Sequence, residues 1–425
     1  MTTAAALLER LAPDPVAGVR AARGRDWLVD HGLPNHREEA WRSTPLVDIL
    51  AVLDSARPAP TSSDAVDRAM VDELAGRHGG PRLVFVNGVF DPTLSDLVAG
   101  AAGLWIGDAD GLRARRRPGA AAPNDEPVDG FHALNWAAGR DVAAVLTEPD
   151  ASLDTPVHVV HLAAPGDGIT VAHPRTVVRL GHGSSLQVIE THVGLGGESI
   201  TNASTRIIAG EDASVTYHRV VAGSPNAIHL GRTGIEQAAR SRARATSVIT
   251  GGHIVRSAID VRLGGPEARS DLDGLYLPSG HQQHDNVITV DHAASHCTSR
   301  QRFKGVVDDH GRGSFSGHVI VRSGTVGSDA SQSNPNLVLA ATAEADTRPW
   351  LEIFADDVRC THGATVGRLD DDALFYLRTR GIPLAESRAM LITAFADEII
   401  NGISPPSLRD LVVAAVARRT SETRR

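Results

Sequence analysis

The chain contains almost no lysine. Lys304 is the only lysine among its 42 lysine and arginine residues. A P-loop that binds nucleotide phosphates needs a lysine directly after its glycine-rich turn. Lys304 lies in the sequence QRFKGVV, and no such turn precedes it. The sequence therefore excludes a lysine-dependent P-loop ATPase.

Cysteine is also scarce, because Cys297 and Cys360 are the only two in 425 residues. This number is typical of a reducing compartment and argues against a disulfide scaffold. No apolar run reaches the length of about 18 residues that a membrane-spanning helix needs, and the first residues lack the pattern of a secretory signal. A net charge of −9 argues against general binding of nucleic acid. We expect a cytoplasmic protein with no membrane or nucleic-acid partner.

Motifs of common enzymes are missing as well. The sequence has no G-x-S-x-G turn, which a serine hydrolase of the α/β type would use. A polysaccharide lyase would act outside the cell, where this chain is not expected. We therefore predict that the protein is not an enzyme.

What the sequence does contain is a long β-rich segment. From about Thr155, short apolar runs alternate with turns rich in Gly, Asp and Ser, as in TVVRL-GHGSS-LQVIETHV. This pattern is typical of a sandwich, a barrel or a solenoid. The length of the segment and the lack of tight hairpin dipeptides within it favour a solenoid.

The flanking regions carry helical patterns. The N-terminal part has predicted helices at Val16–His31, Asp64–Gly76 and Asp129–Leu146, and a hairpin at Leu83–Asp91 with an Asn-Gly turn. The C-terminal part has predicted helices at Asp370–Arg380 and Leu384–Asn401, and a last helix capped by Ser407 with Asp410. We predict three domains: residues 1–150 (helical and mixed), 151–367 (solenoid) and 368–425 (helical).

The helix predicted at Leu384–Asn401 is apolar on more than one side. A surface helix usually has a single apolar stripe, so we expect this helix to pack on two surfaces. The second surface is either another part of the chain or another protein. Its candidate partner-binding residues are Leu384, Met390, Leu391, Phe395 and Ile399.

The segment FADDVRCTHGATVG carries Cys360 and, two residues later, His362. On a strand, side chains at i and i+2 point to the same face, so a thiol and an imidazole would stand together as a pair of soft metal ligands. Plain packing of a Cys and a His is the alternative. If the pair does bind iron, it is half of a site, because the chain has few other cysteines.

Histidines are frequent between His281 and His318. A zinc site would need three or four ligands that converge. His281 and His284 have a spacing that zinc sites use, whereas the adjacent His296 and Cys297 would face opposite ways on a strand. The alternative is a set of exposed histidines on solenoid turns, comprising His281, His284, His292, His296, His310 and His318.

Several long segments resemble one family. SRQRFKGVVDDHGRGSFSGHVIV, DASQSNPNLVLAATAEADTRPWLEIFADDVRCTHGATVGRLDDDALFYLRTRGI and AFADEII look like the SufB/SufD family of the SUF iron–sulfur cluster assembly system. The resemblance runs almost continuously from about Val157 to Gly402. EEAWRSTPL and LVFVNGVFDPTLSDL resemble the N-terminal part of the SufD branch, and the low cysteine content agrees with that branch.

The resemblance implies a right-handed parallel β-helix between an N-terminal and a C-terminal helical domain. It also implies a scaffold subunit that pairs with SufB and binds the ABC-type ATPase SufC through its C-terminal helices. ATP hydrolysis would then belong to the partner. The sequence leaves open whether the isolated chain forms a homodimer, which an exposed terminal edge of the β-helix would favour.

The resemblance also implies a role for the Cys360-x-His362 pair. The histidine of the family motif C-[ST]-H-G-A-T-V-G corresponds to His362, which would be a ligand of a transient iron–sulfur cluster at the interface with SufB. Cys360 would be an auxiliary thiol. The alternative is a purely structural subunit, with all cluster ligands on SufB. The sequence leaves open the cluster type and the participation of a flavin.

Overall fold

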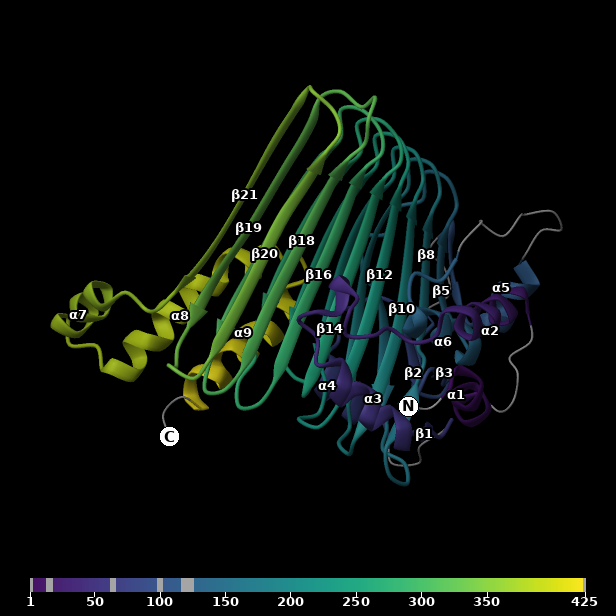
Figure 1. Ribbon diagram of the computed structural model, residues 1–425, viewed down its shortest axis with the longest axis horizontal. Coiled ribbons are helices and arrows are strands. Elements are labelled where there is room, and N and C mark those ends of the chain that lie inside the picture. Colours follow the sequence, from purple (N-terminus) through teal and green to yellow (C-terminus); the bar gives the residue numbers. More distant parts are fainter. Residues whose placement is uncertain (1–2, 13–17, 62–65, 98–101, 116–125, 423–425) are drawn as a thin grey trace.

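Two long, mostly parallel sheets dominate the computed structural model, which describes residues 3–12, 18–61, 66–97, 102–115 and 126–422 (Figure 1). The strands of one sheet alternate along the chain with those of the other. Each strand from β8 to β19 therefore pairs with the strand two positions later in sequence. The architecture is a parallel β-helix, as the sequence pattern and the resemblance predict.

The first sheet has the order β20-β18-β16-β14-β12-β10-β8-β5-β4, and β7 pairs with β10 and with β1. Its strands are β1 (Arg57–Pro58), β4 (Leu104–Gly107), β5 (Ala143–Thr147), β7 (Thr170–Ala172), β8 (Arg175–Leu180), β10 (Ser199–Ala209), β12 (Ile228–Gln237), β14 (Ile254–Leu263), β16 (Gln283–His292), β18 (Arg312–Val321) and β20 (Glu344–Ile353).

The second sheet has the order β21-β19-β17-β15-β13-β11-β9-β6-β2-β3. Its strands are β2 (Arg82–Val86), β3 (Val89–Phe90), β6 (Val157–Ala163), β9 (Ser185–Gly194), β11 (Ser214–Ala222), β13 (Arg242–Ile249), β15 (Arg269–Tyr276), β17 (Thr298–Val307), β19 (Ser328–Val338) and β21 (Val358–Gly367).

Side chains that point between the two sheets form the main core. It is built from alternate residues of many strands, such as Val188, Tyr217, Ile259 and Phe303, all at most 3% exposed. Because successive strands pair in register, each inward residue lies directly on the inward residue of the neighbouring turn. The interior is thus a set of columns that run along the β-helix axis.

Helices cover the outer faces of both sheets. The structure contains α1 (Ala4–Leu11), α2 (Val19–His31), η1 (Glu39–Trp41), α3 (Leu46–Ser55), α4 (Arg68–Ala75), α5 (Ala109–Arg115), α6 (Gly130–Ala138), α7 (Asp371–Thr379), α8 (Leu384–Ile400) and α9 (Pro406–Glu422). The helices α1, α2, α3 and α6 share a core with β7, β10, β12 and β14, whereas α8 and α9 share one with the outer face of the second sheet.

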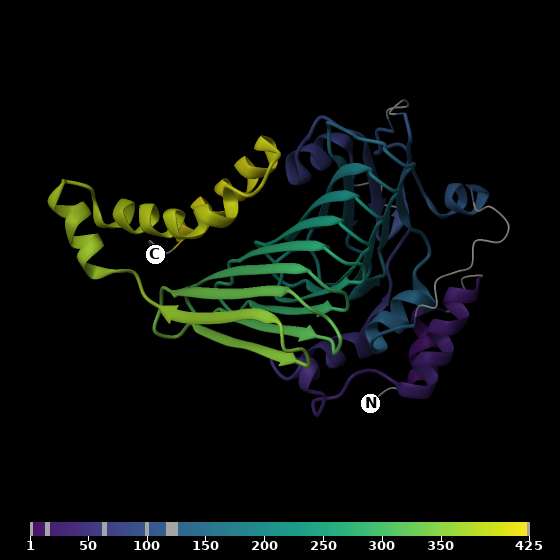
Figure 2. The ribbon, with the colours of Figure 1, turned by 90° about the horizontal axis from the view of Figure 1, so that it is seen from above.

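The two ends of the β-helix differ. Toward the N-terminus, β2, β3, β4 and β5 extend both sheets with chain that precedes the long solenoid. Toward the C-terminus, β20 and β21 are the last strands of their sheets in the described part of the chain (Figure 1). The chain then leaves the β-helix, and α7 stands away from the sheets (Figure 2).

Several local predictions are confirmed. Asn87 and Gly88 form the hairpin turn between β2 and β3, both with positive φ (51° and 79°), as a type I′ turn requires. Asp370 caps α7 by accepting hydrogen bonds from the backbone N–H groups of Asp372 and Ala373. The predicted starts of the helices at Val16 and at Asp64 lie outside the described residues.

Two predictions are wrong. The helix predicted at Asp129–Leu146 ends at Ala138, and Ala143–Thr147 is the strand β5, because its short apolar run pairs with β8 and β4. Ser407 does not cap α9. It lies inside that helix, and its hydroxyl is 2.7 Å from Nδ1 of His78. Among the described residues, none of the helices combines the length and the apolarity that crossing a membrane demands.

Candidate metal-ligand site at the open end of the β-helix

Cys360 and His362 lie on β21, the last strand of the second sheet. In the ladder, Cys360 is opposite Ala330 of β19, and His362 is opposite Gln332. Ala330 and Gln332 point into the β-helix, where they are 1% and 4% exposed. Cys360 and His362 therefore belong to inward columns, but no further turn of the described chain covers them. As predicted, the pair shares one face of a strand.

The two side chains differ in environment. Cys360 is half-buried and packs against the edge of the core, whereas His362 is exposed. Burial raises the pKa of the Cys360 thiol, and the negative charge of Asp329 raises it further. The thiol is therefore protonated at neutral pH in the isolated chain. It would ligate a metal only if the metal displaced the proton.

The donor set of this pair fits iron in part. A thiol and an imidazole are soft and borderline ligands that iron and iron–sulfur clusters accept. Within the described residues, however, no group of three or more His, Cys, Asp and Glu side chains is placed to hold a metal ion. The chain by itself thus offers two candidate ligands, and a complete coordination shell needs donors from elsewhere.

Apolar side chains are exposed around this end of the β-helix. Ile353 at the end of β20 is 40% exposed, Phe354 directly after it is 60% exposed, and Val366 on β21 is 53% exposed. The outer edges of β20 and β21 also carry backbone groups with no ladder partner in the described chain. Such edges are the places where strands of another chain can pair.

Beneath His362 lies a column of buried amides that the sequence reasoning missed. Gln301 of β17 and Gln332 of β19 are neighbours in the column that ends at His362. Nε2 of Gln332 donates a hydrogen bond of 3.3 Å to Oε1 of Gln301. In earlier turns the same column is apolar, with Leu272 and Ala245. Only the strand register reveals this change from apolar to polar.

A second amide network stiffens β19 next to this column. The hydroxyl of Tyr276 donates to Oδ1 of Asn336 at 2.5 Å, and Nδ2 of Asn334 donates to the Tyr276 oxygen at 3.0 Å. Nδ2 of Asn336 donates in turn to Oδ1 of Asn334 at 2.9 Å. All three side chains are at most 3% exposed. This network fixes the strand that carries Gln332.

A different polar cluster lies in the interior near the N-terminal end, and the sequence reasoning also missed it. At its centre is Glu190, which is 1% exposed. Its carboxylate accepts hydrogen bonds from three hydroxyl groups and lies within 3.6 Å of two imidazole nitrogens. The Glu190 cluster consists of Glu190, His161, Thr176, His192, Thr205 and Tyr217.

Hydrogen bonds stabilise the ionised form of Glu190. Burial alone would raise its pKa, but the hydrogen bonds and charges of His161 and His192 outweigh burial and hold the pKa well below its usual value. Burial lowers the pKa of His192 to about 4, and burial raises that of Tyr217 well above its usual value. The cluster is therefore a buried carboxylate whose charge is stabilised by the hydrogen-bond donors around it.

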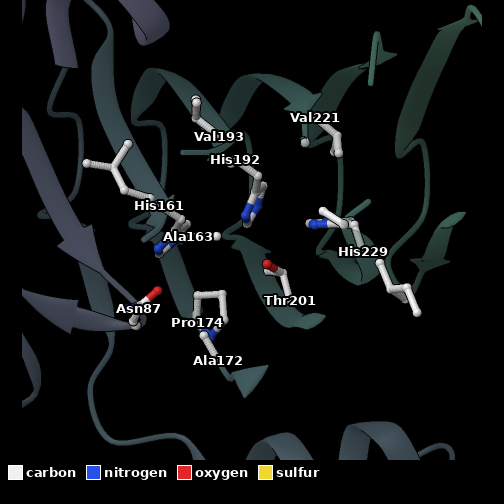
Figure 3. A pocket seen from close by; sticks show the side chains of 16 residues that line it. Asn87, His161, Ala163, Ala172, Pro174, His192, Val193, Thr201, Val221 and His229 are labelled. Atoms are coloured by element: carbon white, nitrogen blue, oxygen red, sulfur yellow. The ribbon is translucent and has the colours of Figure 1, made fainter. Parts of the chain in front are cut away.

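The cavity beside this cluster is small. Figure 3 shows His161, His192 and His229 around it, and Asn87 and Thr201 also line it. Its free volume of about 20 Å³ is enough for one water molecule. The imidazole rings of His161 and His192 are stacked, with centroids 4.9 Å apart. Among the described residues, these histidines are not part of any group of three or more His, Cys, Asp and Glu side chains placed to hold a metal ion.

The predicted histidine group between His281 and His318 is dispersed in the structure. His284 and His292 are fully buried on β16 and not on exposed turns. The exposed His281 and His310 stack on each other at a turn, with centroids 5.2 Å apart. His318 stacks on Trp350. The alternative of exposed turn histidines is thus correct for His281, His296 and His310. It is wrong for His284 and His292, and also for His318, which is half-buried on β18.

The candidate partner-binding residues of α8 lie on different sides of the helix. Leu384 and Met390 are 48% and 46% exposed. Leu391 and Phe395 are half-buried, and Lys304 of β17 donates to the Phe395 carbonyl at 3.0 Å. Ile399 is fully buried against the second sheet. The first half of α8 is thus open to contact, whereas the second half anchors it.

Exposed aromatic residues extend the open part of α8. On α7, Phe375 and Tyr376 are 70% and 58% exposed, and none of the residues of that helix is buried. Together with Leu384 and Met390 they form what we call the α7–α8 surface. It stands clear of the β-helix (Figure 2). Exposed apolar side chains that gather on one surface are typical of interaction surfaces.

Comparisons with known proteins agree on one family. Residues 161–395 match the family model described as "SUF system FeS cluster assembly, SufBD core domain". This range begins near the end of β6, covers the β-helix to β21 and continues into α8. It contains both Cys360 and His362.

Curated relatives match over nearly the whole chain. The iron–sulfur cluster assembly protein SufD of Escherichia coli is 30% identical over 92% of this chain and 90% of its own length. A SufBD family iron–sulfur cluster assembly protein of Synechocystis is 31% identical over 93% of this chain and 89% of its own. A SufBD family protein of Mycobacterium tuberculosis is 29% identical over 90% and 88%.

Proposed function

The chain belongs to the SufBD family of the SUF iron–sulfur cluster assembly system and is of the SufD type, and from this premise we propose that it is a non-catalytic scaffold subunit. In this proposal it pairs with a SufB-like subunit at the open end of its β-helix. It binds a SufC-like ABC ATPase through the α7–α8 surface. The nascent cluster is the cargo of the complex, shared with the SufB-like subunit.

The observation that carries the proposal is the open end itself. Two edge strands, exposed apolar residues and a half-set of metal ligands coincide there. A partner that pairs with the edges of β20 and β21 would cover Phe354 and Val366. The same partner would bring its own ligands next to His362. Pairing with a SufB-like subunit would thus cover the two edge strands, bury the exposed apolar residues and supply the remaining ligands.

We assign His362 as an iron or cluster ligand and Cys360 as an auxiliary thiol. His362 is exposed and free to face a partner, whereas Cys360 is half-buried with a raised pKa. An imidazole binds a metal without first losing a proton whenever it is neutral, but this thiol must give one up. This difference favours His362 as the first ligand.

The same fold offers a route from the ATPase to the cluster site. The helix α8 begins in the exposed α7–α8 surface and ends in the packing of Ile399 against the second sheet. The ion pair between Lys304 and Glu398, 2.7 Å apart, joins it to β17. A displacement of α7 by the dimerising ATPase would thus reach the sheet that ends in β21. This mechanism needs two discrete positions of α8.

The test of the ligand assignment is iron retention in the reconstituted complex with its SufB-like and SufC-like partners. His362→Ala should lose most of the bound iron and cluster absorbance while the complex still assembles. His310→Ala, which removes an exposed histidine from a turn, is the matched control. Wild-type iron content in His362→Ala would refute the assignment and favour the second candidate function below.

The second candidate is a purely structural subunit. The absence of a closed ligand set among the described residues favours it. In that case all cluster ligands lie on the SufB-like subunit, and both His362 and Cys360 can be replaced without loss of iron. The complex would still depend on the α7–α8 surface.

That surface has its own test. Leu384→Asp with Met390→Asp should abolish binding of the ATPase in a pull-down with purified proteins. Both side chains are exposed in the chain alone, so the variant should fold normally. Val47→Asp, which charges another exposed apolar position (72%), is the control. Normal ATPase binding by the double variant would refute this docking surface.

A further inference from the structure

The amide of Gln332 has one buried oxygen without a partner. Gln332 lies on β19 between Gln301 and His362 in one inward column. Its Nε2 donates to Gln301, so its Oε1 is the free end of the amide. This oxygen is buried, and in the described part of the chain nothing donates to it. Buried acceptors in native proteins almost always have a donor.

The next polar group along the column is the imidazole of His362. Residues in register on neighbouring strands lie about 4.8 Å apart, and their side chains stack face to face along the column. A glutamine side chain is long enough to bridge that distance with its oxygen. No other donor on β21 is in register with Gln332, since Cys360 and Ala364 belong to the columns on either side.

We infer that Gln332 is a positioning residue for His362. Its Oε1 accepts a hydrogen bond from one ring N–H of His362, which fixes the side-chain rotamer and the tautomer. The other ring nitrogen then keeps its lone pair and faces the open end. Ligating histidines generally donate their second N–H to such an acceptor, which orients the ring.

The position of Gln332 suits this role because β19 is held rigidly. The buried network of Tyr276, Asn334 and Asn336 fixes the same strand a few residues further on. Gln301 fixes the amide itself from the other side. The acceptor is therefore placed before His362 meets any metal. An exposed imidazole without such an acceptor would sample several rotamers.

The part of this inference that concerns metal rests on the proposed function, whereas the hydrogen bond can be tested without a metal. The first readout is the ¹⁵N spectrum of histidine-labelled full-length chain above the pH at which imidazole titrates. The His362 signals are assigned by their loss in His362→Asn. In the wild type, we expect a single tautomer and a ring proton that exchanges slowly with water.

Gln332→Met removes the acceptor and keeps the bulk of the side chain. We expect His362 to show mixed tautomers and a fast-exchanging ring proton in this variant. Gln332→Glu, which restores an acceptor, should recover the single tautomer. Ser333→Ala, on the outward face of the same strand, should match the wild type. If Gln332→Met folds poorly, the double variant Gln301→Leu with Gln332→Leu removes both amides and leaves no amide without its partner.

The second readout is iron retention by the reconstituted complex. Loss of an outer partner of a metal ligand typically weakens binding 10- to 100-fold, so Gln332→Met should weaken iron retention at least about 10-fold. Unchanged His362 signals in Gln332→Met would overturn the inference and leave the proposed function intact. Wild-type iron retention in His362→Ala would overturn the ligand role, and the tautomer readout would still decide the hydrogen bond.

Discussion

Polar side chains occupy the interior of the β-helix at two levels, the Glu190 cluster near one end and the column of Gln301, Gln332 and His362 at the other. In the Glu190 cluster, both carboxylate oxygens accept hydrogen bonds, and burial lowers the pKa of the neighbouring His192 to about 4. In the column, the amide oxygen of Gln332 has no donor among the described residues, and the last side chain, His362, is exposed. A closed network stabilises the fold, whereas a column that ends at an edge strand leaves its last side chain open to a ligand or a partner.

The largest loss of stability is expected when the Glu190 cluster loses its central carboxylate. Glu190→Ala leaves three buried hydroxyl groups and two imidazoles without their common acceptor. Breaking a buried charged network typically costs about 3–5 kcal/mol of unfolding free energy. Urea unfolding should show a decrease of this size. Glu198→Ala, at an exposed position, should change the unfolding free energy by less than about 0.5 kcal/mol.

If Glu190→Ala were as mild as the Glu198 control, the cluster would not be a stabilising network. Glu190→Gln separates charge from hydrogen bonding, because the amide still accepts from some hydroxyl groups. We expect Glu190→Gln to lower the unfolding free energy, but by less than Glu190→Ala does.

The two halves of α8 also contrast a packed region with an open one, and substitutions in each half should differ in their effect on stability. Ile399 is completely buried, so Ile399→Ala removes packing and should lower the unfolding free energy by about 2–4 kcal/mol. Met390 is exposed, so Met390→Ala should change it by less than about 0.5 kcal/mol. Urea unfolding of the two variants side by side is the measurement. Equal losses of unfolding free energy in the two variants would mean that Ile399 does not anchor α8 to the second sheet.

Acid should lower the unfolding free energy, because several histidines are buried in the interior. Burial lowers the pKa of several histidines, so in the folded state they stay neutral between pH 6.5 and about 4, whereas the unfolded chain takes up protons there. Stability must therefore fall as pH decreases through this window, by up to about 1.4 kcal/mol per pH unit for each histidine. The pKa values are about 3 for His132, His173 and His284, and about 4 for His192, His218 and His292.

Glu190 adds to this dependence with the same sign. Its folded-state pKa is depressed, so its contribution is present above the pKa of an unfolded glutamate and is lost as pH falls toward the folded value. Thermal unfolding from pH 7.5 to 4.5 should show the part of the decline that the histidines cause, because the part due to Glu190 lies below about pH 4.3. His218→Gln should make it shallower, whereas His281→Asn with His310→Asn, at exposed positions, should leave it unchanged. A flat profile in the wild type would contradict the burial of neutral histidines.

A small loss of stability is expected at the open end. Cys360→Ala should lower the unfolding free energy of the isolated chain by about 1 kcal/mol, because the thiol is half-buried. His362→Ala should lower it by about 1 kcal/mol, the usual net contribution of the one hydrogen bond that it would donate to Gln332. Urea unfolding of the chain without partners is the measurement. A loss above about 2 kcal/mol for His362→Ala would mean that the pair is structural.

Much of the fold could be predicted from the sequence. The alternation of apolar runs and Gly/Asp turns predicted a solenoid, and the caps at Asp370 and Gly381 predicted α7. The segment Asp129–Leu146 was predicted incorrectly, since a short apolar run can form either a helix or a strand. Its pairing with β8, which is distant in sequence, decided the outcome.

The candidate site was predictable only in part. The spacing of Cys360 and His362 on one strand can be read from two residues. The amide column under them cannot, because Gln301, Gln332 and His362 are about 30 residues apart and meet only through the register of three strands. The Glu190 cluster was hidden for the same reason, since its members come from β6, β8, β9, β10 and β11.

The open end has a thermodynamic consequence for the last turn of the β-helix. In a linear stack, each turn is stabilised only by its neighbours, and a terminal turn without a cap has one neighbour fewer. The turn that contains β20 and β21 is therefore the part of the stack that opens most easily. A partner that binds there acts as the missing cap, so protection of β21 against hydrogen exchange will rise with the partner's concentration, as mass action requires.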